Sequence, residues 1–216
     1  MIEHPDATWL FAGRDPLVTD KRSMLREGQH SEHWWTALFS ILLLHLASQP
    51  TPPKIALRRH IPLEPRFQYP ETGSLDYHGM SLSSILVEAR LLEAVALKLF
   101  NISEWPLDFQ TLEVDLAISL PERNRVILIE NKTERSRTNS LDRYEQAVKY
   151  LRGFGKNADL YVLISGGHWN DEIWGAIARN NLEIILWEDV LRLLHAIPLF
   201  RDVFHNDLPA YFAAYP

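Results

Sequence analysis

The 216-residue chain contains no cysteine. It therefore has no disulfide framework, no thiolate zinc site and no cysteine nucleophile. Long hydrophobic runs are also lacking, because the longest apolar stretch, residues 37–47, is too short to cross a bilayer and contains Ser40 and His45. The N-terminal sequence MIEHPDATWLF lacks the basic region and the apolar core of a signal peptide. We therefore expect a cytoplasmic protein that has no membrane partner.

An excess of positive charge is lacking as well. The formal net charge is −6, which excludes a protein that coats nucleic acid through a broad basic surface. It does not exclude a nuclease, because catalytic carboxylates contribute negative charge and contact with a nucleic-acid backbone needs only a local positive strip. The hydrophobic content of 46%, with seven Trp, is sufficient for a sizeable core in one domain.

Two apolar runs, residues 112–120 and 125–132, are separated by the turn-like sequence Pro-Glu-Arg-Asn. They predict a β-hairpin. If these four residues form the loop, counting back along both strands puts Asp115 directly opposite Glu130. Because side chains alternate along a strand, each strand has two distinct faces. One face is a predicted core face that carries Val114, Leu116, Ile118, Ile127 and Ile129. The other is a predicted chemical face that carries Glu113, Asp115, Ala117, Glu130 and Lys132.

The opposed carboxylates of Asp115 and Glu130 need a counter-charge. Directly opposed residues have Cβ atoms about 5 Å apart, and like charges at that separation are destabilising. A divalent cation such as Mg²⁺ or Mn²⁺ suits hard carboxylate oxygens. Lys132 lies on the same face, where its ammonium could orient an attacking water or neutralise charge on a phosphate. The alternative is an ordinary hairpin in which Glu113 and Lys132 form a surface salt bridge.

These residues resemble the PD-(D/E)XK nuclease superfamily: an aspartate at position 115, a hydrophobic strand, then Glu130-Asn131-Lys132. The resemblance implies that Asp115 and Glu130 are metal ligands, that the Asn131 carbonyl is a third ligand and that Lys132 is the catalytic lysine. Val114 stands where the motif has its proline. The resemblance also implies an α/β fold with a restriction-endonuclease-like mixed β-sheet flanked by helices, and Mg²⁺ or Mn²⁺ as cofactor.

Residues 141–152 show the apolar spacing of a helix. Arg143, Gln146 and Tyr150 gather on a separate stripe of this helix. Gln146-x-x-x-Tyr150 resembles the QxxxY element of RecB-like members of the superfamily, which lies beside the active site and touches substrate or supports the catalytic groups. We therefore add Gln146 to the catalytic set, and Arg143 and Tyr150 to the nucleic-acid-binding set. The alternative is a partly exposed Gln and Tyr on an ordinary helix.

Upstream, the mostly apolar residues 81–101 predict one long helix. The superfamily resemblance implies that a glutamate on the helix before the catalytic strands reaches the metal, and Glu88, between two apolar residues, is the candidate. Its alternative role is a solvated surface carboxylate. Downstream of Lys132, Arg135 and Arg137 lie among hydroxyl residues and are candidates for phosphate contacts, with an ordinary loop as the alternative.

The rest of the chain predicts strands at residues 159–165 and 182–187 and helices at residues 170–180 and 188–195. The usual first strand of the superfamily core has a candidate position within residues 107–112. We interpret residues 1–80 as a mainly helical N-terminal extension, with a helix at residues 31–48, packed on the core. Residues 81–216 form the predicted nuclease-like domain.

Our hypothesis is therefore a metal-dependent nuclease, and more narrowly an endodeoxyribonuclease of a restriction, repair or phage-defence type. An RNase or a junction resolvase stays open, because these residues do not read the sugar or the duplex shape. A different class of protein is a catalytically silent nuclease fold that serves as a nucleic-acid-binding or assembly subunit. A homodimer, or a partner protein of a multi-component system, is compatible with either hypothesis.

Overall fold

A computed structural model describes residues 32–63, 66–132, 141–167 and 170–203 of the chain. The strands are β1 (Ala56–Arg59), β2 (Ile61–Leu63), β3 (Arg66–Gln68), β4 (Glu71–Ser74), β5 (Ile85–Arg90), β6 (Glu113–Leu120), β7 (Arg125–Lys132), β8 (Asn157–Ile164) and β9 (Glu183–Leu186). The α-helices are α2 (Glu32–Ala47), α3 (Glu93–Phe100), α4 (Leu141–Gly153), α5 (Asp171–Arg179), α6 (Trp187–Ala196) and α7 (Pro198–Val203). Short 3-10 helices are η2 (Leu82–Ser84), η3 (Leu107–Phe109) and η4 (Pro121–Arg123).

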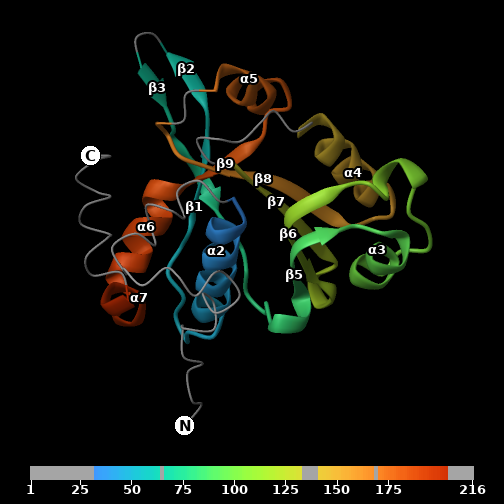
Figure 1. The fold of residues 1–216 in the computed structure, drawn as a ribbon, viewed down its shortest axis with the longest axis horizontal. Helices are drawn as coiled ribbons and strands as arrows, with labels where there is room; N and C mark the ends of the chain where they lie inside the picture. The colour runs from blue at the N-terminus through green and yellow to red at the C-terminus, as the bar shows by residue number, and fades with distance from the viewer. Residues whose placement is uncertain (1–31, 64–65, 133–140, 168–169, 204–216) are drawn as a thin grey trace, which may run out of the picture.

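A mixed seven-stranded sheet in the order β4-β1-β9-β8-β7-β6-β5 forms the centre of the fold (Figure 1). Strand β6 runs antiparallel to both β5 and β7, whereas β7, β8 and β9 are parallel to one another. Strand β1 is antiparallel to β9 and to β4. Helix α4 connects β7 to β8, and α5 connects β8 to β9. This arrangement confirms the predicted α/β class and the mixed sheet flanked by helices.

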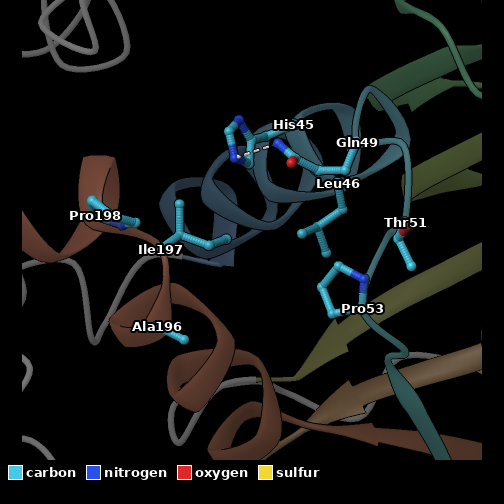
Figure 2. Close-up of a pocket in the computed structure, with 8 residues that line it drawn as sticks. All are labelled: His45, Leu46, Gln49, Thr51, Pro53, Ala196, Ile197 and Pro198. Atoms are coloured by element: carbon cyan, nitrogen blue, oxygen red, sulfur yellow. Dashed lines mark hydrogen bonds between the residues drawn. The ribbon is translucent and has the colours of Figure 1, made fainter.

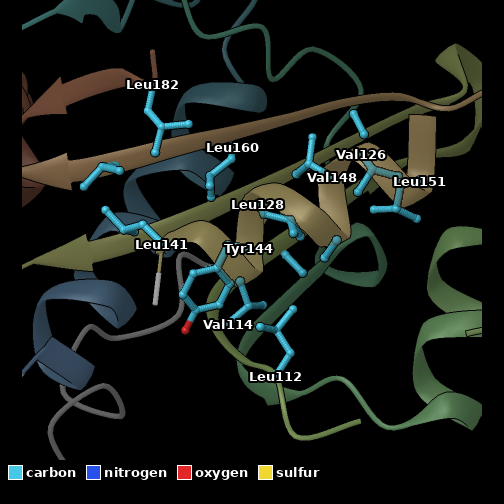
Figure 3. Packing of buried hydrophobic residues seen from close by; sticks show 14 of the residues in the cluster. Leu112, Val114, Val126, Leu128, Leu141, Tyr144, Val148, Leu151, Leu160 and Leu182 are labelled. Atoms are coloured by element: carbon cyan, nitrogen blue, oxygen red, sulfur yellow. The ribbon is translucent and has the colours of Figure 1, made fainter. Parts of the chain in front are cut away.

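Helices cover both faces of the sheet, so the protein has three layers. One core cluster joins α2, α6 and α7 to the sheet residues Leu116, Ile127 and Ile129. The other joins α3, α4 and α5 to the opposite sheet face, where Leu128 and other strand residues meet the apolar side of α4 (Figure 3). A sheet buried on both faces explains why its central strands are apolar at nearly every position.

The hairpin register is confirmed. Leu120 pairs with Arg125, and the recorded pairing continues to Leu116 and Ile129, as counting back from the turn predicted. The turn itself is η4, which ends at Asn124 with a left-handed φ of 49°, a conformation that asparagine adopts more readily than most residues. The predicted strands and helices at α2, α4, β8, α5, β9 and α6 are also present, with ends that differ by at most two residues.

The predicted helix over residues 81–101 is wrong. Its first half is η2 and the edge strand β5, and only its second half is helical, as α3. Glu88 has a left-handed φ of 50°, which interrupts any continuous right-handed helix. Pairing with β6 outweighs the helix propensity of this leucine- and alanine-rich segment, and Ile85 and Val87 are β-branched residues that favour strands.

The strand expected within residues 107–112 is also wrong. The strand that precedes β6 in the chain and pairs with it is β5. The candidate segment at residues 107–112 contains η3 instead, and its Phe109 is buried. Short-range patterns did not distinguish the two segments, because an edge strand of six residues carries too few alternations to identify it.

The described part of the N-terminal region is not mainly helical. It contains one helix, α2, and the four strands β1 to β4. Strands β1 and β4 extend the central sheet beyond β9, and α2 packs into the core cluster on one sheet face. Residues on both sides of position 80 therefore contribute to one continuous sheet. None of the helices in the described ranges is long and apolar enough to cross a membrane.

Candidate metal centre

The candidate site lies where β6 and β7 separate. Their recorded pairing ends at Leu116 and Ile129, one residue before Asp115 and Glu130. Beyond that point the Asp115 side chain occupies the position of a strand partner, because its Oδ2 accepts a hydrogen bond from the Asn131 backbone N–H at 2.7 Å. Asp115 is half-buried. The carboxylate is thus held directly against the Glu130-Asn131-Lys132 segment.

The regular alternation of faces breaks at Asp115. Leu116 packs in the cluster on the α2 side of the sheet, whereas Val114 packs in the cluster on the α4 side. The predicted core face is therefore correct for four residues and wrong for Val114. On the predicted chemical face, Ala117, Glu130 and Lys132 are buried, Asp115 is half-buried and Glu113 is exposed. The change of face occurs at Asp115, beyond the last recorded pair of β6 with β7.

Glu130 and Lys132 form a buried ion pair on the α4 side of the sheet. Lys132 Nζ donates to Glu130 Oε1 at 2.6 Å, and the two side chains are 0% and 2% exposed. Their ladder partners, Val162 and Ile164 in β8, belong to the α4-side cluster, which places the pair on that face. Removing two charges from water costs several kcal/mol per ion, and this cost is repaid only by good geometry and further hydrogen bonds. The alternative considered for this hairpin, a surface bridge between Glu113 and Lys132, does not form, because Lys132 is buried and pairs with Glu130.

Asn131 points to the opposite face and was expected to contribute only its backbone. Its side chain is 1% exposed and bonds to two helices. Nδ2 donates to Thr36 Oγ1 of α2 at 3.2 Å, and Oδ1 accepts from Trp187 Nε1 of α6 at 3.0 Å. No local pattern identifies Thr36 or Trp187 as site residues, because they meet Asn131 only through tertiary packing.

Glu88 lies near the site on a strand and not on the predicted helix. It lies in β5 between Val87, which pairs with Leu116, and Ala89, which pairs with Val114. This places Glu88 at the level of Asp115 on the adjacent strand, although the ladder is interrupted there and Glu88 is exposed. Glu88, Asp115 and Glu130 therefore lie on three successive strands at one height of the sheet.

The three predicted site residues on α4 each lie in a different environment. Gln146 is exposed. Arg143 donates from one guanidinium nitrogen to the Asp108 carbonyl at 2.6 Å and to Thr111 Oγ1 at 2.8 Å, so it ties α4 to the segment before β6. The Tyr150 ring lies in an aromatic cluster with Trp105, Phe109 and Phe154. None of the described contacts joins these three side chains to the Glu130–Lys132 pair.

Two further predicted residues, Arg135 and Arg137, lie outside the described residues.

A second polar group lies at the carboxyl ends of β8 and β9, where Glu188 Oε1 accepts from Ser165 Oγ at 2.6 Å and from the Gly166 N–H at 3.0 Å. The Tyr69 hydroxyl donates to the Gly166 carbonyl at 2.8 Å. Burial, with the Glu188 charge, raises the pKa of Tyr69 to about 12. This group holds the segment after β3 against the sheet.

The donor set fits a hard divalent cation. Asp115 and Glu130 offer carboxylate oxygens and Asn131 offers a backbone carbonyl, which are the ligand types that Mg²⁺ and Mn²⁺ prefer. Across the described ranges, no three His, Cys, Asp or Glu side chains gather as a metal-binding group. A Mg²⁺ site usually needs only one or two protein carboxylates, with water and substrate oxygens completing its shell.

A cavity of about 390 Å³ lies elsewhere, between the end of α2 and the α6–α7 junction (Figure 2). It is lined by His45, Leu46, Gln49, Thr51, Pro53, Ala196, Ile197 and Pro198. None of the candidate site residues lines this cavity. The candidate metal centre lies apart from this cavity, at the end of the β6–β7 hairpin.

Comparisons of this chain with protein-family models, with curated proteins and with solved structures gave no match.

Proposed function

We propose that this protein is a metal-dependent nuclease that hydrolyses phosphodiester bonds, and specifically an endodeoxyribonuclease. One observation carries the proposal. Asp115 accepts a hydrogen bond at 2.7 Å from the N–H of Asn131, the residue between Glu130 and Lys132, and those two residues form an ion pair at 2.6 Å. Two carboxylates and a lysine at one place provide the groups that metal-assisted phosphodiester cleavage requires.

The residues have distinct roles in this proposal. Asp115, Glu130 and the Asn131 carbonyl would hold Mg²⁺ or Mn²⁺, which when bound supplies a Lewis acid and acidifies its coordinated water. Lys132 Nζ lies 2.6 Å from Glu130 Oε1, where it would orient the attacking water and stabilise negative charge that develops on the phosphate. Burial makes both contributions stronger than they would be in water.

The order of elements supports the proposal. The antiparallel strands β6 and β7 are followed by helix α4 and the parallel strand β8, which is the hairpin, helix and strand order that resembles the PD-(D/E)XK core. The resemblance of Gln146 and Tyr150 to the QxxxY element adds less support, because Tyr150 packs in an aromatic cluster.

A cleavage assay tests the proposal on plasmid DNA, single-stranded DNA and RNA, each with Mg²⁺ or Mn²⁺. The variants Asp115→Asn, Glu130→Gln and Lys132→Met should each reduce cleavage by about 10²–10³-fold or more, the usual loss for one electrostatic stabiliser of a transition state. Glu113→Gln, an exposed carboxylate two residues from Asp115, is the matched control and should cleave normally. Unchanged cleavage by the three site variants would refute the site assignment.

A catalytically silent nuclease fold that binds nucleic acid or assembles with a partner is the second candidate. The burial of Glu130 and Lys132, which neutralise each other, favours it. The two candidates differ in their response to metal. A nuclease site should gain about 2.7 kcal/mol of unfolding free energy at Mn²⁺ concentrations 100 times its Kd, whereas a silent site should gain nothing. Specific nucleic-acid binding without cleavage under either metal would support the silent fold.

A further inference from the structure

The buried side chain of Asn131 interrupts an apolar row on β7. Residues 127, 129 and 131 point to the α2 side of the sheet, and the first two are isoleucines in that core cluster. Asn131 continues the row at 1% exposure. A buried carboxamide must satisfy its donors and its acceptor, and leaving one unsatisfied costs about 1–3 kcal/mol. An apolar residue would fill this position without that requirement.

Asn131 is bonded on three sides. Its backbone N–H holds the Asp115 carboxylate, its Nδ2 donates to Thr36 Oγ1, and its Oδ1 accepts from the Trp187 indole. Thr36 and Trp187 are themselves 2% and 3% exposed. This one residue therefore connects a proposed metal ligand to the helices α2 and α6 across the sheet.

The position of Asn131 explains why such a connection is useful. The recorded β6 ladder ends at Ile129, and on that side the Asn131 N–H bonds to the Asp115 side chain, while on the other side β8 pairs with β7 as far as Lys132. Rotation of this strand end would move Asp115 relative to Glu130. Mg²⁺ requires near-octahedral geometry with ligands at about 2.0–2.1 Å, so a small displacement of one ligand weakens binding.

We infer that Thr36 and Trp187 are positioning residues of the metal centre, which act through the Asn131 side chain to hold the Asp115 and Glu130 ligands in register. This inference rests on the proposed function, since it presumes that the carboxylates bind a metal. It makes α2, from the N-terminal region, a functional part of the site.

The test is Mn²⁺ binding to the full chain by calorimetry, at a temperature at which circular dichroism shows each variant folded. Thr36→Val and Trp187→Phe should each weaken Mn²⁺ binding by about 10–100-fold, the usual effect of removing a hydrogen bond behind a metal ligand. Thr36→Ser, which keeps the hydroxyl, should bind as the wild type does. The matched controls are Ser40→Ala and Trp105→Phe, which lose a buried hydroxyl of α2 and an indole bond to the Leu91 carbonyl without touching Asn131.

A double-mutant cycle provides a second measurement. If Thr36 acts through Asn131, then adding Thr36→Val to Asn131→Leu should weaken Mn²⁺ binding no further. Equal Mn²⁺ affinity in the wild type, Thr36→Val and Trp187→Phe would overturn the inference and leave the proposed function standing. Mn²⁺ binding with the expected variant pattern but no cleavage of any nucleic acid would overturn only the nuclease. A wild type that binds no Mn²⁺ would overturn both.

Discussion

Each end of β7 carries a basic residue that forms ion pairs with acidic side chains, and the two ends differ in how deeply these side chains are buried. At the first end, Arg125 contacts Asp159 at 2.9 Å and Asp76 at 3.7 Å, with side chains 17%, 26% and 35% exposed. At the second end, Lys132 contacts Glu130 at 2.6 Å, with side chains almost fully buried. The same strand therefore has a solvated ion-pair network at one end and a desolvated pair at the other.

This difference in burial distinguishes the ion pairs of Arg125 from the Glu130–Lys132 pair of the candidate site. An ion pair that retains solvent costs little and contributes little, about 0–1 kcal/mol. A buried pair has a large desolvation cost, and an apolar pair of the same volume is often as stable or more stable. Stability therefore does not by itself explain why Glu130 and Lys132 are charged residues, and the proposed function offers a chemical reason. Four predictions test this contrast.

The largest effect is expected from breaking the buried pair. Lys132→Met leaves the Glu130 carboxylate without its ammonium, so the free energy of unfolding should fall by about 3–5 kcal/mol. Urea denaturation followed by circular dichroism measures this loss. A fall in unfolding free energy no larger than that caused by breaking an exposed ion pair would contradict the burial of Glu130 and Lys132.

Replacing both charges should reverse most of that loss. Glu130→Leu combined with Lys132→Met removes the desolvation cost together with the attraction, so we expect a stability equal to the wild type or higher by about 1–4 kcal/mol. The double variant should be inactive in the cleavage assay. If it is as unstable as Lys132→Met, the pair is needed for folding and the contrast between the two ends fails.

The free energy of unfolding at alkaline pH should depend on Tyr161, which lies near Arg125. Burial, followed by the Asp159 charge, raises the pKa of Tyr161 to about 12, while an unfolded tyrosine has a pKa of about 10. The folded state thus favours the neutral phenol, and its stabilising effect is present below pH 10. Between about pH 10 and 12 the stability should fall by up to about 1.4 kcal/mol per pH unit. Tyr161→Phe should show a shallower fall when unfolding free energies are compared across this range.

The smallest effect is expected at the exposed edge of the same network. Arg123 forms an ion pair with Asp76, and their side chains are 43% and 35% exposed. Arg123→Met should lower the unfolding free energy by only about 0.2–1 kcal/mol, and less at high salt because exposed charges are screened. Urea denaturation at low and high salt measures both. A loss comparable to that of Lys132→Met would remove the distinction between the two ends.

The hairpin was predictable because its information is local. A four-residue turn between two alternating runs sets the register from Leu120 and Arg125 back to Leu116 and Ile129. Asp115 lies one residue beyond this ladder and is held by its hydrogen bond from the Asn131 N–H. The apolar side of α4 was predictable for the same reason, since helical periodicity identifies it. The strand β5 was not, because its pattern equally suits a helix and only pairing with β6 decides between them.

The sequence by itself determined the α/β class, the β6–β7 hairpin and the presence of Asp115, Glu130 and Lys132 on it, the residues to which we assign the proposed chemistry. The tertiary structure decided what surrounds them. It buried Glu130 against Lys132, opened the strands at Asp115, and brought Thr36 and Trp187 to Asn131 from positions 95 and 56 residues away. The physical reason is that strand registers follow from neighbouring residues, whereas burial and contacts across a sheet depend on how whole layers pack.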